Sequence, residues 1–209
     1  MLRKIVIGVV GLVVAAVLVL WLIVLPMQVV QAVRSPLGTT PASVGLDYVN
    51  VAFPAHGDAT AIRAWFMPAK EARGVVIFVH GGNVNRRDPY AGGLAIDRFL
   101  VAAHMSVLAL DLRNHGESGT ASGGRITLGV DESTDVRGAI DALATLAPKL
   151  PVYLMGTSMG GAAAIFAATD DARVKKLVLI DPLLDAHSTE IGALHATLGL
   201  PRLLLGPVR

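Results

Sequence analysis

Short apolar segments alternate with helix-like segments along the middle of the sequence, and this alternation constrains the fold more than any other feature. One apolar run, Gly74–Val79, reads GVVIFV, which is typical of a strand buried on both faces of a sheet. The same reading predicts further strands at Ser106–Leu112, Val152–Met155 and Val174–Ile180. Helices are predicted between the strands, over Ala91–Ala103, Asp131–Leu146 and Gly160–Ala168.

Two β-like runs precede this region, at Leu46–Phe53 and Ala61–Met67, and we predict that they form an antiparallel pair. The later alternation predicts right-handed crossovers and an α/β fold, a doubly wound and mostly parallel sheet with helices on both faces. Residues 183–205 are predicted to form one or two helices and no strand. The last strands of such a sheet are therefore expected to be lacking, which would leave an unpaired edge and uncovered apolar faces.

The N-terminal segment Ile5–Leu25 is a continuous apolar run, IVIGVVGLVVAAVLVLWLIVL, that follows Arg3 and Lys4. A membrane-spanning helix needs about 20 such residues. We predict a membrane anchor over residues 1–27, with Trp21 at an interface and the rest of the chain on the non-cytoplasmic side. The alternative is secretion after cleavage of a signal peptide at Val30–Ala32, although signal peptides have apolar regions of about 7–15 residues.

Residues 28–43 contain Pro36, Gly38 and Pro41, and we interpret them as a linker. A single α/β domain is predicted over residues 44–209, which suits the usual domain length of roughly 100–200 residues.

The composition argues against several classes of protein. The net charge is +2 and the basic residues are scattered, so nucleic acid is not an expected partner. The chain has 0 cysteines, which excludes disulfides, thiolate zinc sites and a cysteine nucleophile. A phosphate-binding enzyme is disfavoured, because the loop GTSMGG lacks the lysine of a P-loop and no GxGxxG follows the first buried strand.

The segment Gly156–Gly160 reads GTSMG and lies between a predicted strand and a predicted helix. This context is the one that a GxSxG nucleophile elbow requires, so we predict Ser158 as a nucleophile. Acyl transfer also needs backbone amides that bind the developing oxyanion. We predict the amides of Met159 and Gly82 for this role, with Asn83 as the next choice for the second amide.

Three segments carry a resemblance to the α/β-hydrolase family: FVHGG, LALDLRNHGES and YLMGTSMGGAAA, within a region from about Leu46 to Pro182. The sequence looks most like membrane-anchored serine hydrolases of the lysophospholipase and serine-aminopeptidase type. The resemblance implies hydrolysis of an acyl ester, thioester or amide through an acyl-serine, without a metal or organic cofactor. By the same analogy His80 supports its loop, and Asp111, Arg113 and His115 belong to a structural loop.

The catalytic acid and base are the open point of the prediction. The family order is serine, then Asp or Glu, then His, and the last two usually follow the seventh and eighth strands, which are not predicted here. The candidates after the elbow are Asp181, Asp185, Glu190, His187 and His195, and none is assigned. Two hypotheses follow: a membrane-anchored serine hydrolase acting on a small or lipid-derived acyl substrate, or an inactive hydrolase-like fragment that serves as a membrane-tethered binding module.

Overall fold

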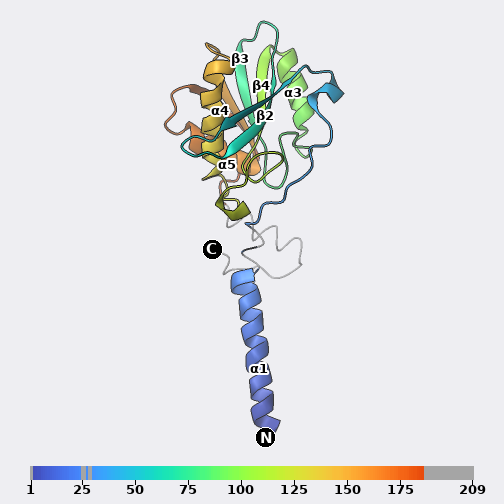
Figure 1. The fold of residues 1–209 in the computed structure, drawn as a ribbon, viewed down its shortest axis with the longest axis vertical. Helices are drawn as coiled ribbons and strands as arrows, with labels where there is room; N and C mark the ends of the chain where they lie inside the picture. Colours follow the sequence, from blue (N-terminus) through green and yellow to red (C-terminus); the bar gives the residue numbers. More distant parts are fainter. Residues whose placement is uncertain (1, 25–26, 28–29, 186–209) are drawn as a thin grey trace. The chain divides into compact units, whose positions relative to one another are not determined.

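The protein is described from a computed structural model, which covers residues 2–24, 27 and 30–185 (Figure 1). These residues fall into two units, which are described separately. The first contains the N-terminal helix, and the second is Ala32–Leu184.

The N-terminal helix α1 spans Leu2–Val19 and continues as a π-helical turn, η1, over Leu20–Val24. None of its residues is buried. The helical segment Leu2–Val24 has 23 residues and is long and apolar enough to cross a membrane. A signal sequence meets the same criterion, so the helix by itself does not separate an anchor from a cleaved leader.

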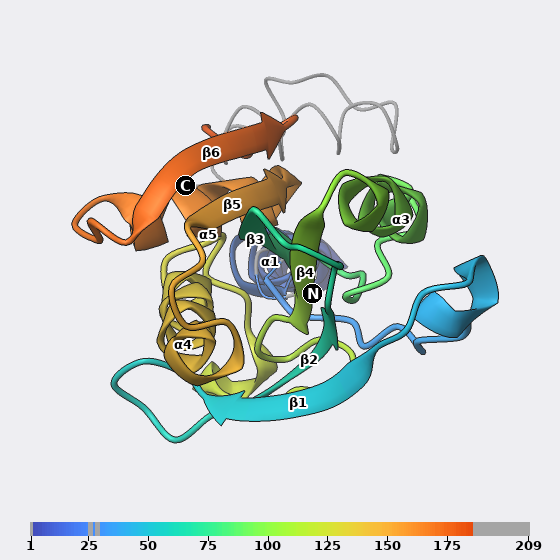
Figure 2. The ribbon, with the colours of Figure 1, turned by 90° about the horizontal axis from the view of Figure 1, so that it is seen from above.

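The second unit is built on one six-stranded sheet in the order β1-β2-β4-β3-β5-β6 (Figure 2). Its strands are β1 Val49–Pro54, β2 Ala61–Met67, β3 Gly74–Val79, β4 Met105–Asp111, β5 Val152–Thr157 and β6 Val174–Ile180. The strand β2 is antiparallel to both β1 and β4, and the remaining pairs are parallel. The predicted mostly parallel sheet with an antiparallel entry is therefore confirmed.

Within Ala32–Leu184, three α-helices cover the sheet, on both of its faces. They are α3 Gly93–Ala102, α4 Glu132–Leu146 and α5 Ser158–Ala168. Figure 2 shows α3 on one side of the sheet and α4 with α5 on the other. Two short 3-10 helices, η2 Pro41–Val44 and η3 Ser122–Gly124, lie in the connections. Residues 183–185 are not helical, and the rest of the segment 183–205, for which one or two helices are predicted, lies outside the described residues.

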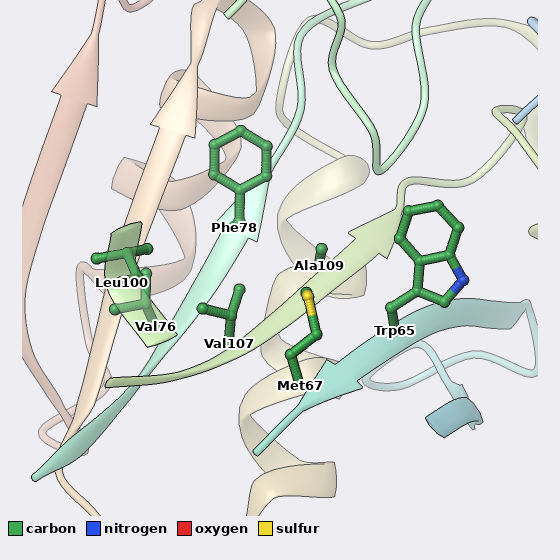
Figure 3. Packing of buried hydrophobic residues seen from close by; sticks show 7 residues of the cluster. All are labelled: Trp65, Met67, Val76, Phe78, Leu100, Val107 and Ala109. Atoms are coloured by element: carbon green, nitrogen blue, oxygen red, sulfur yellow. The ribbon is translucent and has the colours of Figure 1, made fainter. Parts of the chain in front are cut away.

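The core between α3 and the sheet is made of side chains that alternate along three neighbouring strands (Figure 3). Side chains two residues apart point to the same face of a strand, so the alternating side chains of the three strands lie on one face of the sheet. The members are Trp65, Met67, Val76, Phe78, Leu100, Val107 and Ala109. Arg86 stacks over the Trp65 ring at 4.5 Å, which places a guanidinium at the edge of this core.

The strand β6 is an edge strand within the described residues, since β5 is its partner there. Four consecutive apolar side chains on it, Leu177–Ile180, are between 37% and 47% exposed. This agrees with the expectation that the last predicted strand leaves apolar surface uncovered.

The compact unit begins at Ala32, within the segment that was predicted as a linker. The amide of Ala32 donates to the carbonyl of Gly124 at 3.0 Å, and later residues of the segment also hydrogen-bond to loops of the unit. Residues 32–43 are therefore part of the folded domain.

Asp97 on α3 is a buried carboxyl group, and neither of its oxygens has a hydrogen-bond partner in the described part of the chain. Burial raises the pKa of Asp97 from 3.8 to about 7. Between these two pH values the native state keeps a proton that the unfolded state has released. The free energy of unfolding is therefore expected to fall as the pH rises from 3.8 to 7.

We expect the Asp97→Asn variant to lose this pH dependence, so that its stability relative to the wild type is higher at pH 8 than at pH 5 by about 3 kcal/mol. Urea unfolding at pH 5 and pH 8 measures the effect, with the exposed Asp47→Asn as the matched control. Parallel stability curves for wild type and Asp97→Asn would contradict the assignment.

Candidate active site

Ser158 lies at a sharp turn where a strand passes directly into a helix. The strand β5 ends at Thr157 and α5 begins at Ser158, two positions before the predicted start of the helix at Gly160. The φ angle of Ser158 is +47°, a left-handed conformation that is unusual for a residue other than glycine. Such a strained strand-to-helix turn is the geometry of a nucleophile elbow, and it leaves the Ser158 side chain exposed.

Glycines are needed on both sides of the turn because backbones approach each other closely there. A Cβ atom on Gly160 would lie 2.3 Å from the carbonyl oxygen of His80. A Cβ atom on Gly156 would lie 2.5 Å from the carbonyl oxygen of Gly160. The two glycines that were identified from the sequence thus let α5 pack against the end of β3.

The loop after β3, residues 81–83, lies beside the elbow. A Cβ atom on Gly81 would lie 3.4 Å from Cβ of Ser158, and one on Gly82 would lie 3.8 Å from Sδ of Met159. The structure therefore brings Gly82 next to the predicted nucleophile and Met159, although Gly82 is far from both in the sequence.

The amides on either side of Gly82 are already engaged. The amide of Gly81 donates to Oδ2 of Asp88 at 3.4 Å, and the amide of Asn83 donates to Nε2 of His115 at 3.1 Å. The amide of Gly82 has no hydrogen-bond partner within the described residues. At the other side of the site, the amides in the first turn of a helix such as α5 have no partner inside the helix. Gly82 is thus the residue of this loop whose amide has no partner among the described residues, whereas the amide of Asn83 is engaged.

Ser158 opens into a cavity of about 330 Å³. Its lining includes the polar residues Asp88 and Asp181 and the apolar residues Val84 and Ile180. The complete lining is Gly81, Gly82, Val84, Asp88, Tyr90, Ala91, Thr157, Ser158, Ile180 and Asp181.

Two buried histidines near the loop are held as neutral hydrogen-bonding groups. Nε2 of His80 accepts from the amide of Leu112 at 3.0 Å, and its Nδ1 lies 2.6 Å from the carbonyl of Gly81. His115 repeats this pattern, with its Nδ1 2.7 Å from the carbonyl of Arg113. Burial lowers the pKa of each of the two imidazoles to about 4. With both nitrogens occupied, neither ring is free to take a proton from a serine, and His80 has the supporting role expected of it.

Asp111 and Arg113 also have structural roles. The carboxylate of Asp111 accepts from the amide of Arg86 at 2.7 Å, from its guanidinium at 3.1 Å and from the amide of Glu117 at 2.8 Å. Arg113 pairs with the buried Asp135 at 2.7 Å. These contacts tie the loops at the carboxyl ends of the strands to each other, which agrees with the architectural role inferred by analogy.

The remaining candidates for the catalytic acid and base are Asp181, Asp185, Glu190, His187 and His195. Asp181 follows β6 and lines the Ser158 cavity, whereas Asp185 is not in that lining. His187, Glu190 and His195 lie outside the described residues. The other histidines in residues 30–185, His56 and His104, contact Asp141 and Lys70 away from the cavity lining.

Asp88 was not identified from the sequence. Its side chain is buried, and its carboxylate accepts from Oγ1 of Thr157 at 2.7 Å and from the amide of Ala91 at 3.1 Å. It thereby joins the glycine loop to the residue before the nucleophile. Only its place shortly after the HGG motif could have drawn attention to it.

No group of three or more His, Cys, Asp or Glu residues that could hold a metal occurs in the described ranges.

A serine at a nucleophile elbow, above a mostly parallel sheet and beside a glycine loop, defines the α/β-hydrolase class. The model of the serine aminopeptidase family S33 matches residues 70–205. The chain belongs to this family of α/β-hydrolases.

Individual relatives agree with this assignment. Human monoglyceride lipase is 31% identical over 180 residues, which cover 81% of this chain and 56% of the lipase. An esterase from Pyrococcus furiosus superposes with a TM-score of 0.73 at 25% identity, over 86% of this chain and 67% of the esterase. A carboxyl esterase from Bacillus coagulans shares the fold, with a TM-score of 0.56 at 20% identity over 74% of this chain and 51% of the esterase. The chain thus spans little more than half the length of the lipase.

Proposed function

We propose that this protein is a serine hydrolase that cleaves an acyl ester through an acyl-serine intermediate. The observation that carries the proposal is the left-handed Ser158 at the start of α5, adjacent to Gly82 and Met159. Family membership supports the same chemistry.

In the proposed reaction, Oγ of Ser158 attacks the ester carbonyl carbon and gives its proton to a general base. The carbonyl oxygen becomes an oxyanion, which accepts hydrogen bonds from the amides of Gly82 and Met159. The positive end of the α5 helix dipole adds to this stabilisation. Collapse of the intermediate expels the alcohol, which takes the proton from the base, and water then hydrolyses the acyl-serine.

The base in this proposal comes from outside residues 30–185, because His80 and His115 have both ring nitrogens engaged. His187 and His195 are the histidines of this sequence that lie outside residues 30–185. Asp181 is the proposed acid, since it follows β6 and lines the Ser158 cavity.

We propose a lipid-derived acyl ester as the substrate. Its support is the similarity to monoglyceride lipase and the apolar side chains of Val84, Ala91 and Ile180 in the cavity lining. Tyr90, 89% exposed, adds an aromatic ring to the lining. The helix Leu2–Val24 is proposed to anchor the protein in a membrane, with the hydrolase domain on the non-cytoplasmic side.

The second candidate function is a membrane-tethered binding module without turnover. One observation favours it: none of the described histidines lines the cavity that contains Ser158. The two functions differ in whether Ser158 is activated.

A fluorophosphonate probe tests the proposed hydrolase. The full-length protein, extracted in detergent, is incubated with the probe and its intact mass is measured, with Ser158→Ala as the control. We expect the mass of one probe adduct on the wild type and none on the variant. A folded wild-type protein that gains no adduct would favour the binding module.

A further inference from the structure

The residues that follow the N-terminal helix are bound to the glycine loop of the site. We call residues 32–40 the strap. The strap contains no regular secondary structure, and its hydrogen bonds join it to loops that lie about 50 to 90 positions later in the chain.

Asn83, the residue after Gly82, is held by the strap at two atoms. The amide of Val33 donates to Oδ1 of Asn83 at 2.9 Å. The hydroxyl of Ser35 donates to the carbonyl oxygen of Asn83 at 2.8 Å. The strap therefore fixes both the side chain and the peptide plane of the residue next to the proposed oxyanion donor.

A second set of contacts ties the strap to Asn85, two residues after Asn83. The side-chain amide of Asn85 donates to the carbonyls of Ser35 and Pro36, at 3.1 and 3.0 Å. Asn85 is buried, so loss of these acceptors would leave polar hydrogens without partners.

Arg34 extends the strap to the loop that carries His115. Its guanidinium donates to the carbonyls of His115 and Gly116 at 3.2 and 2.8 Å, and to the hydroxyl of Thr120 at 2.9 Å. His115 in turn accepts the amide of Asn83. The strap thus contacts both partners of the hydrogen bond between the amide of Asn83 and the ring of His115.

We propose that the strap is a positioning element that sets the Gly82 amide in the oxyanion hole, with Ser35 and Arg34 as its positioning residues. The inference rests on the proposed function. Because a misplacement of about 1 Å can cost roughly 10²-fold in rate, a strap variant should act on turnover more than on substrate binding.

The test uses the full-length protein in detergent micelles with p-nitrophenyl acetate as the ester. For Ser35→Ala we expect kcat to fall about tenfold, less than the loss of an oxyanion donor, with KM within twofold of the wild type. Ser35→Thr retains a hydroxyl and is expected to recover most of the rate. Arg34→Ala should show the same split between kcat and KM, whereas Arg98→Ala, an exposed arginine on α3, should show none.

Two outcomes would overturn the strap proposal. One is an unchanged kcat in both Ser35→Ala and Arg34→Ala. The other is an equal loss of rate in Ser35→Ala and Ser35→Thr, which would indicate a general disturbance of the fold.

Failure of the proposed function is recognised separately, because the wild type would then show neither turnover nor probe labelling that depends on Ser158. In that case hydrogen exchange still tests the positioning. The amide of Asn83 is expected to exchange faster in Ser35→Ala than in the wild type, and equal exchange would refute the role of the strap.

Discussion

Replacement of Ser158 by alanine is expected to reduce kcat/KM for ester hydrolysis by a factor of roughly 10³ to 10⁶, because the reaction loses its nucleophile. Ser158 is exposed at the elbow, so its hydroxyl is not needed for packing. The thermal midpoint of unfolding should therefore stay close to that of the wild type. Initial rates with p-nitrophenyl esters and a thermal melt measure the two quantities on the same preparation.

The matched control is Ser43→Ala, since Ser43 is also exposed and its hydroxyl donates to the nearby carbonyl of Thr40. Its rate should equal that of the wild type. Full activity in the Ser158→Ala variant would rule out the acyl-serine mechanism.

The Arg113→Met variant is expected to have the largest effect on stability, a loss of about 3–5 kcal/mol in the free energy of unfolding. Its partner Asp135 is 0% exposed, and the Arg113 side chain is 5% exposed. Removal of the guanidinium leaves a buried carboxylate without its counter-ion, while methionine keeps much of the side-chain volume. Urea unfolding followed by circular dichroism measures the change.

Arg173→Met is the control for this prediction. Arg173 also pairs with two aspartates, Asp171 and Asp141, but its side chain is 49% exposed. Water and salt screen such pairs, so a change of about 0–1 kcal/mol is expected. If the two arginine variants lost the same stability, burial would not be what makes the Arg113 pair important.

Elements with a strong local pattern could be predicted from the sequence. The bounds of β2, β3 and β6 agree with the prediction, because each is rich in apolar residues and lies between polar or turn residues. The elbow and the glycine loop were also predicted, and the structure places Gly82 beside Met159. Because β3 and β5 are parallel neighbours, the glycine loop after β3 and the elbow after β5 lie together at the carboxyl ends of the strands.

Features that depend on single polar contacts between distant segments could not be predicted. Val33 and Asn83 are 50 positions apart, and nothing periodic marks either residue. The strap was interpreted as part of a linker because Pro36 and Gly38 suit an irregular chain, which it is. Asp97 is a polar residue in an amphipathic helix, and sequence alone would place it toward solvent rather than in the core.

Removal of the N-terminal helix by cleavage would change the charge at the start of the strap. If a signal peptidase cut after Ala32, the nitrogen of Val33, which donates to Oδ1 of Asn83, would become a free α-amino group. Such groups have pKa values of about 7.7–8.0, so a positive charge that titrates near neutral pH would lie next to the glycine loop. A retained helix leaves an uncharged amide at the same point. The proposed hydrolase would then have different pH profiles with and without its N-terminal helix.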